Sequence, residues 1–272
     1  MINFYKLVKY IFFYYSKFFL NKFLKNRNFS FNKKNLYNYY CSKIKKDGYV
    51  LIDNFLDLVD CSKIINSIDH FIKNNPDHIY HDDKFSDIRL FGAQNISDKI
   101  NNFFCSELPL SVGQNYYSGK LKNLMTMANK VVFKNDNLGS GGGWHRDGID
   151  FQYKAILYLV DVDDNNGPFQ LIKNSQKLFY YIKDCINLNM NIFDTRIDNS
   201  KVQKLIKKDN RRLITLSGKA GSLILVDTTI IHRGCPLISG SRYALTNYYY
   251  PIDECDNHLN QFTPYIKENI VN

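Results

Sequence analysis

GSLILVDTTIIHRGCPLISGSRYALTNYYY, residues 221–250, is the stretch of the sequence that decides the fold. It contains two runs rich in aliphatic and aromatic residues, 222–226 and 243–250, and turn-forming residues at 239–241 precede the second run. Short runs of this kind between turn residues are typical of β-strands. The stretch therefore predicts two strands, and it places a histidine, His232, in the connection between them.

Further short β-type runs lie on the N-terminal side of this stretch. Turn-formers separate them at 139–143, 163–167 and 218–221, and the expected strands are 131–133, 155–160, 169–172 and 213–215. Many short strands with turn signals between them predict an all-β barrel or sandwich over about residues 125–250. A polar insertion rich in Lys and Asn, about residues 176–210, interrupts this pattern, and we expect it to be partly helical.

The part of the body before residue 125 has a different pattern of apolar residues. Residues 49–52 predict an opening strand, and residues 58–74 predict a helix because Ile64, Ile65, Ile68 and Ile72 recur at helical spacing. A second helical region is expected around 98–112. The body is therefore expected to be mainly β with flanking helices.

The sequence GWHRD, residues 143–147, contains the first candidate for chemistry. On a strand, positions two apart share a face, so His145 and Asp147 could reach one metal ion. His232 follows 87 residues later, and two histidines with one carboxylate form the facial triad of non-haem Fe(II) oxygenases. A lone His-x-Asp also occurs by chance in surface turns, so the prediction of a metal site depends on its surroundings.

Arg242 is the second candidate. It lies ten residues after His232 and opens the strand 242–246. A guanidinium can bind a carboxylate through two parallel hydrogen bonds, so Arg242 could anchor the remote carboxylate of 2-oxoglutarate. The alternative is an ordinary structural ion pair.

Together these segments resemble the phytanoyl-CoA dioxygenase family of Fe(II)/2-oxoglutarate oxygenases over most of residues 44–250. KKDGYVLIDNFL is similar to the opening strand of that family, GWHRD to its metal motif, NGPFQLIKNSQK to a later strand and turn, and AGSLILVDTTIIHRG with GSRYALTNYYY to the segment of the second histidine. The turn at 173–176 departs from the family, because it lacks the Pro, Gly and His often found there.

The resemblance implies a double-stranded β-helix (jelly roll, cupin-like), with His145, Asp147 and His232 as iron ligands and Arg242 as the anchor of 2-oxoglutarate. It also implies Fe(II), 2-oxoglutarate and O2 as cofactor and cosubstrates, with succinate and CO2 as co-products. The retained Asp147 favours hydroxylation, because halogenating relatives have a small residue in its place. The substrate would be a small molecule or a carrier-linked metabolite. The alternative is a non-oxidative cupin-like protein that binds a metal or a ligand.

Other residues are ambiguous. His78, His81 and Asp82 are more typical of a solvated loop or lid than of a second metal site. Trp144 and Arg146 could line the mouth of the site, and Trp144 could equally belong to the core. Three more side chains could face the site or serve only structure: Lys130, Lys134 and Tyr158.

The charge is distributed unevenly along the chain. Residues 1–46 contain eleven Lys or Arg and no acidic residue, which leaves 25 basic and 26 acidic side chains in the rest of the chain. A nearly neutral body argues against nucleic-acid binding. We expect an N-terminal arm, residues 1–43, and an oxygenase domain, residues 44–272. Residues 4–25 of the arm form a basic amphipathic pattern that could lie on an anionic membrane surface or dock on the body. Six scattered cysteines without a CxxC pair favour reduced thiols and a cytoplasmic location.

Overall fold

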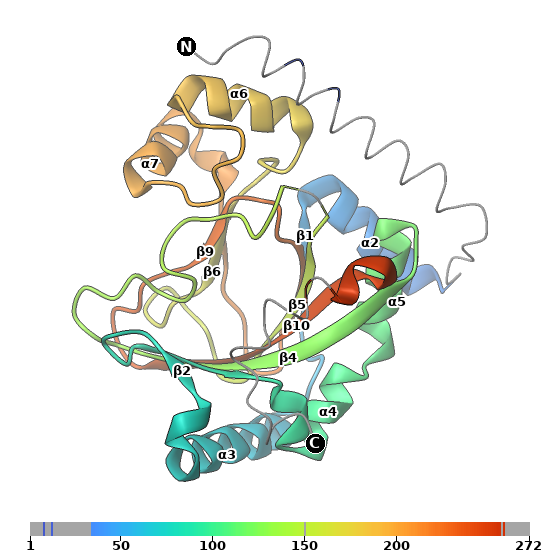
Figure 1. The fold of residues 1–272 in the computed structure, drawn as a ribbon, viewed down its shortest axis with the longest axis vertical. Helices are drawn as coiled ribbons and strands as arrows, with labels where there is room; N and C mark the ends of the chain where they lie inside the picture. The colour runs from blue at the N-terminus through green and yellow to red at the C-terminus, as the bar shows by residue number, and fades with distance from the viewer. Residues whose placement is uncertain (1–7, 9–11, 13–33, 150, 257, 259–272) are drawn as a thin grey trace.

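The computed structural model describes residues 34–149, 151–256 and 258, together with Val8 and Phe12 (Figure 1). The predicted amphipathic pattern at 4–25 therefore lies almost entirely outside the described residues. Within the described part of the chain, no helix is long and apolar enough to cross a membrane.

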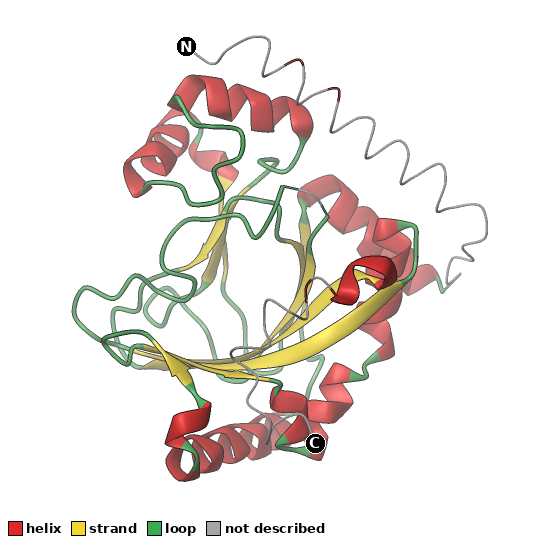
Figure 2. Cartoon of the chain, in the orientation of Figure 1, coloured by secondary structure: helices red, strands yellow, loops and turns green. Residues whose placement is uncertain are grey.

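In the described part of the chain, ten strands form two antiparallel sheets. Figure 2 shows the strands in yellow. The large sheet has the order β1-β8-β5-β10-β4-β3-β2, and the small sheet has the order β7-β6-β9. The strands are β1 (Tyr49–Ile52), β2 (Tyr80–His81), β3 (Asp87–Phe91), β4 (Leu121–Val132), β5 (Tyr153–Tyr158), β6 (Phe169–Ile172), β7 (Leu213–Leu216), β8 (Leu223–Asp227), β9 (His232–Gly234) and β10 (Ser241–Pro251).

The helices lie outside the sheets. Residues of α2, α3, α4 and α5 pack with the outer face of the large sheet, whereas α6 and α7 belong to the segment between β6 and β7 (Figure 1). Their bounds are α2 (Asn35–Asp47), α3 (Leu58–Asn74), α4 (Asp98–Phe104), α5 (Glu107–Tyr117), α6 (Leu178–Leu188) and α7 (Asn199–Lys208). The mainly β architecture with flanking helices is confirmed.

Strand alternation separates the two faces of the large sheet. On β10, Leu245 and Tyr249 belong to the cluster that packs with the outer helices, whereas Ala244 belongs to a cluster shared with the small sheet. That second cluster includes Phe169 and Leu171 of β6, so the two sheets pack face to face. Every second residue of β5 and β10 therefore points into the space between the sheets.

Several boundaries differ from those predicted. β4 is much longer than the expected strand 131–133, and the expected helix around 98–112 is divided into α4 and α5. The predicted boundary between residues 43 and 44 falls inside α2, whose Tyr37, Cys41 and Ile44 are buried. Residues 35–43 thus pack with the body, and the division into an arm and a domain otherwise stays a prediction.

Candidate metal centre

His145 and His232 are neighbours through their backbones. The His145 N–H donates to the His232 carbonyl at 2.9 Å, and the His232 N–H donates to the His145 carbonyl at 2.8 Å. Such a reciprocal pair is the unit of an antiparallel ladder. It brings the two side chains to the same face, with their ring centroids 4.3 Å apart.

The local structure of the His-x-Asp segment corrects one expectation. His145 makes isolated β-bridges with His232 and Arg196, and it does not lie in a continuous strand. The preceding residues, 141–143, are three glycines that all have positive φ, which a strand does not accommodate. The Asp147 N–H still donates to the Thr228 carbonyl at 3.0 Å, so the spacing of two places both side chains on one face.

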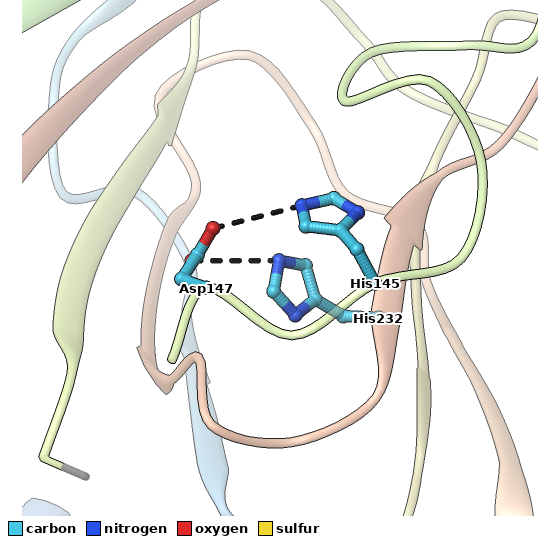
Figure 3. Close-up of side chains that lie close together, drawn as sticks. All are labelled: His145, Asp147 and His232. Carbon is cyan, nitrogen blue, oxygen red and sulfur yellow. Dashed lines mark ion pairs between the residues drawn. The ribbon is translucent and has the colours of Figure 1, made fainter. Parts of the chain in front are cut away.

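The three predicted ligands converge (Figure 3). The Nε2 atoms of His145 and His232 lie 3.6 Å from Asp147 Oδ1 and Oδ2, respectively. One potential ligand atom from each residue lies within 4.8 Å of the other two, and the described residues contain no other such group. Two imidazoles and one carboxylate match the donor set of a non-haem Fe(II) site.

Hydrogen bonds to the other imidazole nitrogens set the tautomers. His145 Nδ1 lies 2.9 Å from the Gly143 carbonyl, and His232 Nδ1 lies 2.9 Å from the Ile230 carbonyl. A carbonyl oxygen only accepts, so each Nδ1 carries the proton and each Nε2 presents a lone pair to the centre. The residues present therefore fit a divalent metal ion.

Burial and charge support the same protonation states. Burial, reinforced by His145, lowers the pKa of His232 to about 3, so this imidazole is neutral at physiological pH. Burial alone would raise the pKa of Asp147, but Lys154 and the two histidines outweigh it and hold that pKa well below its usual range. A neutral imidazole and an ionised carboxylate are the forms that bind metal.

Lys154 of β5 is part of this site, and the sequence did not indicate it. Its Nζ lies 2.8 Å from Asp147 Oδ2 and 4.2 Å from the centroid of the Tyr248 ring. Lys154 is directly opposite Tyr248 in the sheet, so both side chains leave the same face. The one signal in the sequence is a lysine in an otherwise apolar strand.

Arg242 lies on the same inner face, at the start of β10. It is 5% exposed and donates to the Gly167 carbonyl and, at 3.3 Å, to Asn129 Oδ1. Asn129 in turn donates to Asp87 Oδ1 at 2.6 Å, and Asp87 forms an ion pair with Arg89. The Arg242 Nε is buried and has no hydrogen-bond partner in the described part of the chain, so the guanidinium retains an unused donor.

A cavity of about 310 Å³ joins these groups. It lies between the sheets, and its size is that of a small-molecule site. The polar side chains around it include those of the triad, Lys154, Arg242, Arg89, Arg196, Asn129, Thr246 and Tyr158.

The two residues on either side of His145 have structural roles. Trp144 is 3% exposed and packs in the cluster formed by α6 and α7, so its side chain belongs to the core. Arg146 lines the cavity but is also buried, and its guanidinium donates to the carbonyls of Ser175 and Thr229. Arg146 thereby ties the metal motif to two connecting segments.

The remaining ambiguous side chains are placed as follows. Lys130 forms an ion pair with Asp69 of α3 at 2.7 Å, on the outer side of the large sheet, whereas Tyr158 lines the cavity. The His81 ring stacks on Phe85 at 3.6 Å, and Asp82 accepts hydrogen bonds from Ser86. His81 and Asp82 thus stabilise a local turn. Lys134 is exposed.

A double-layered antiparallel sheet with a two-histidine, one-carboxylate site between its layers defines a cupin-like metal-dependent oxygenase class. The family model described as phytanoyl-CoA dioxygenase matches residues 44–243, and the chain belongs to this family. The resemblance and the jelly-roll fold predicted from the sequence are confirmed. No curated protein matches the chain.

Solved structures agree on the fold. The epimerase SnoN, in complex with Fe3+, α-ketoglutarate and nogalamycin RO, is 13% identical, with a TM-score of 0.60 over 79% of this chain and 84% of that chain. HygX from Streptomyces hygroscopicus, with nickel and 2-oxoglutarate bound, is 13% identical, with a TM-score of 0.59 over 79% and 86%. EctD from S. alaskensis is 13% identical, with a TM-score of 0.60 over 84% of both chains. The prediction of iron and 2-oxoglutarate agrees with the SnoN complex and with HygX, which is also solved with iron bound, whereas the EctD structure is an apo form.

Proposed function

We propose that the protein is an Fe(II)/2-oxoglutarate-dependent hydroxylase of a small molecule. His145, Asp147 and His232 would hold the iron, and Arg242 would bind the remote carboxylate of 2-oxoglutarate. The observation that carries the proposal is the convergence of the three ligand atoms within 4.8 Å of one another, in a cavity that Arg242 also lines.

Neighbouring groups set the orientation of the two imidazoles and the charge of the carboxylate. The two Nδ1–H groups are held by backbone carbonyls, which fixes the imidazole planes and directs both Nε2 atoms to one point. Asp147 is ionised and lies next to the ammonium of Lys154, which partly neutralises its charge. When bound, Fe(II) would supply the activation of O2 that no side chain provides.

Arg242 suits a dicarboxylate cosubstrate. Its guanidinium is held between the Gly167 carbonyl and Asn129, so its direction is fixed before any ligand binds. A preorganised guanidinium loses little entropy when it binds a carboxylate. The buried Nε without a partner is a donor that a bound carboxylate would satisfy.

Hydroxylation is the outcome that the ligand set favours. Asp147 occupies the carboxylate position, so the site has no small residue there to make room for a halide ion. The neighbours SnoN and SnoK are described as an epimerase and a carbocyclase, so the fold also supports other oxidative outcomes. The products must therefore be identified, and consumption of 2-oxoglutarate alone does not define the reaction.

The direct test is succinate release from 2-oxoglutarate by iron-loaded protein, with mass spectrometry of candidate substrates for the addition of one oxygen atom. We expect succinate release to depend on Fe(II) and to be lost in His145→Ala. A slow release should also occur without substrate. His70→Ala, on the exposed side of α3, is the matched control. If the loaded protein neither binds nor consumes 2-oxoglutarate, a non-oxidative cupin-like binding protein becomes the better description.

A further inference from the structure

Lys154 is a buried cation in the cavity. It is 9% exposed, and on β5 it lies between Val226 of β8 and Tyr248 of β10. Among the described residues its ion pair is with Asp147, with a distance of 2.8 Å from Nζ to Oδ2. Burial of an ammonium is costly unless an opposite charge lies close to it.

Binding of the proposed iron and 2-oxoglutarate would change the balance of charges around Lys154. Two positive charges of Fe(II) and one of Arg242 would be matched by Asp147 and by the two carboxylates of 2-oxoglutarate. The carboxylate that now neutralises Lys154 would thus be shared with the metal. Lys154 would remain as a positive charge in excess, next to the place where a substrate must lie.

The other cationic side chains around the cavity do not have an unneutralised positive charge of this kind. Arg89 is paired with Asp87. The Arg146 guanidinium donates to the carbonyls of Ser175 and Thr229 and lies 4.4 Å from the centroid of the Tyr181 ring. Arg196 is exposed, so water can screen its charge, and its guanidinium donates to the Gly141 carbonyl. Lys154 is therefore the cation that requires a further anion in the loaded site.

We propose that the substrate is an acid and that its oxyanion, a carboxylate or a phosphate, binds Lys154 beside the metal. This inference rests on the proposed function, because it assumes that iron and 2-oxoglutarate occupy the cavity. An ammonium is a compact charge without the planar fork of arginine, so it accepts either oxyanion. Since Lys154 contacts the metal ligand Asp147, the oxidised carbon would lie close to the acid group of the substrate.

The inference can be tested without turnover. Nickel replaces iron, 2-oxoglutarate is added to saturation, and the loaded protein is titrated calorimetrically with three matched pairs of probes. Benzoate is compared with benzamide, hexanoate with hexanamide, and phenyl phosphate with phenol. We expect at least one acid to bind on the order of 30-fold more tightly than its neutral partner, as the loss of a buried charge pair implies.

Variants assign this preference to Lys154. Lys154→Met should remove the preference, and Lys154→Arg should retain part of it. Lys130→Met is the matched control, because Lys130 also pairs with an aspartate but on the outer side of the sheet, and it should retain the full preference. Melting temperatures and nickel affinities of all variants establish that they are folded and loaded. If Lys154→Met does not fold, the reduced preference expected of Lys154→Arg assigns the preference to Lys154, and a wild type without any preference for acids overturns the inference.

Two results would overturn the inference. One is a wild-type protein that binds no acid more tightly than its neutral partner. The other is a folded, nickel-loaded Lys154→Met variant in which the preference for acids persists; if that variant also loses affinity for 2-oxoglutarate, Lys154 is a cosubstrate ligand instead. Failure of the nickel-loaded wild type to bind 2-oxoglutarate is a separate outcome, and it contradicts the proposed function itself.

Discussion

His145 and His232, 87 residues apart in the sequence, donate backbone hydrogen bonds to each other's carbonyls at 2.9 and 2.8 Å. The pair fixes the register between the glycine-rich loop and β9. Because residues directly opposite in an antiparallel pair point to the same side, the register also sets the distance between the two imidazoles. The geometry of the candidate metal centre is thus determined by the backbone before a metal binds.

Removal of one imidazole should therefore abolish metal binding without unfolding the protein. In His232→Ala the backbone pair remains, but the metal loses a ligand. Loss of an outer partner of a ligand costs about 10- to 100-fold in metal affinity, and loss of the ligand itself should cost more. Nickel titration by calorimetry measures this, with His81→Ala as the control. Unchanged affinity in His232→Ala would show that the metal binds elsewhere.

Arg242→Met should weaken the binding of 2-oxoglutarate to nickel-loaded protein and leave nickel binding unchanged. The loss of a buried, charge-assisted contact corresponds to about 2 kcal/mol or more, which is roughly 30-fold in Kd. Arg211→Met is the control, since Arg211 is exposed and pairs with Asp209 on the surface. Equal affinities in the two variants would assign the cosubstrate carboxylate to another cation.

Much of this arrangement is predictable from local patterns. Helix α3 has the predicted bounds because its isoleucines recur at helical spacing, and Ile64 and Ile68 are fully buried. β6 is also found at the predicted residues, since a short apolar run between turn residues is typical of a β-strand. The triad was inferred from residue types and spacing, and its three side chains do converge.

Features set by tertiary contacts were not predictable. β4 contains Asn123, Asn129 and Lys130 among its apolar residues. Because these polar residues interrupt the apolar pattern, the sequence predicted only the end of this long strand. Those polar side chains are accommodated by partners far away in the sequence, as Lys130 is by Asp69. In the same way, Lys154 is a site residue only because the fold brings β5 beside Asp147.

Asn129 offers a test of such a distant contact. In Asn129→Leu the guanidinium of Arg242 loses an acceptor, and Asp87 loses a donor. We expect the Kd of 2-oxoglutarate to rise about tenfold, since one hydrogen bond to a charged group contributes about 1.5 kcal/mol or more. Nickel affinity should not change. A variant with wild-type affinity for 2-oxoglutarate would show that the Gly167 carbonyl alone holds Arg242.

The buried His232 should make the metal-free protein sensitive to acid. Its folded-state pKa of about 3 lies below the ordinary value of 6.5, so between these values the unfolded chain binds a proton that the folded chain does not. Stability should therefore fall as the pH is lowered through this window, by up to about 1.4 kcal/mol per pH unit. Asp147 contributes in the same direction, but only as the pH falls below its ordinary value of 3.8.

Urea unfolding in the presence of a chelator, at several pH values from 6.5 down to about 4.5, measures this slope within the window of His232. We expect His232→Asn to have a shallower slope even if its stability is lower throughout. His70→Asn, at an exposed position of α3 outside the site, is the matched control variant. Identical slopes in the wild type and His232→Asn would contradict the assignment.

Gly221 provides a test of the scaffold rather than the site. It precedes β8 with a φ of +85°, and its carbonyl accepts hydrogen bonds from the N–H groups of Phe55 and Leu56. An added Cβ would lie 1.9 Å from the Leu56 carbonyl oxygen, which is backbone and cannot rotate away. Gly221→Ala should lower the free energy of unfolding by about 2 kcal/mol or more, since strain and a clash act together. Gly148→Ala is the control, because no described atom lies within 4 Å of its added Cβ. Equal urea midpoints for the two variants would show that the connection between β1 and α3 moves freely with respect to β8.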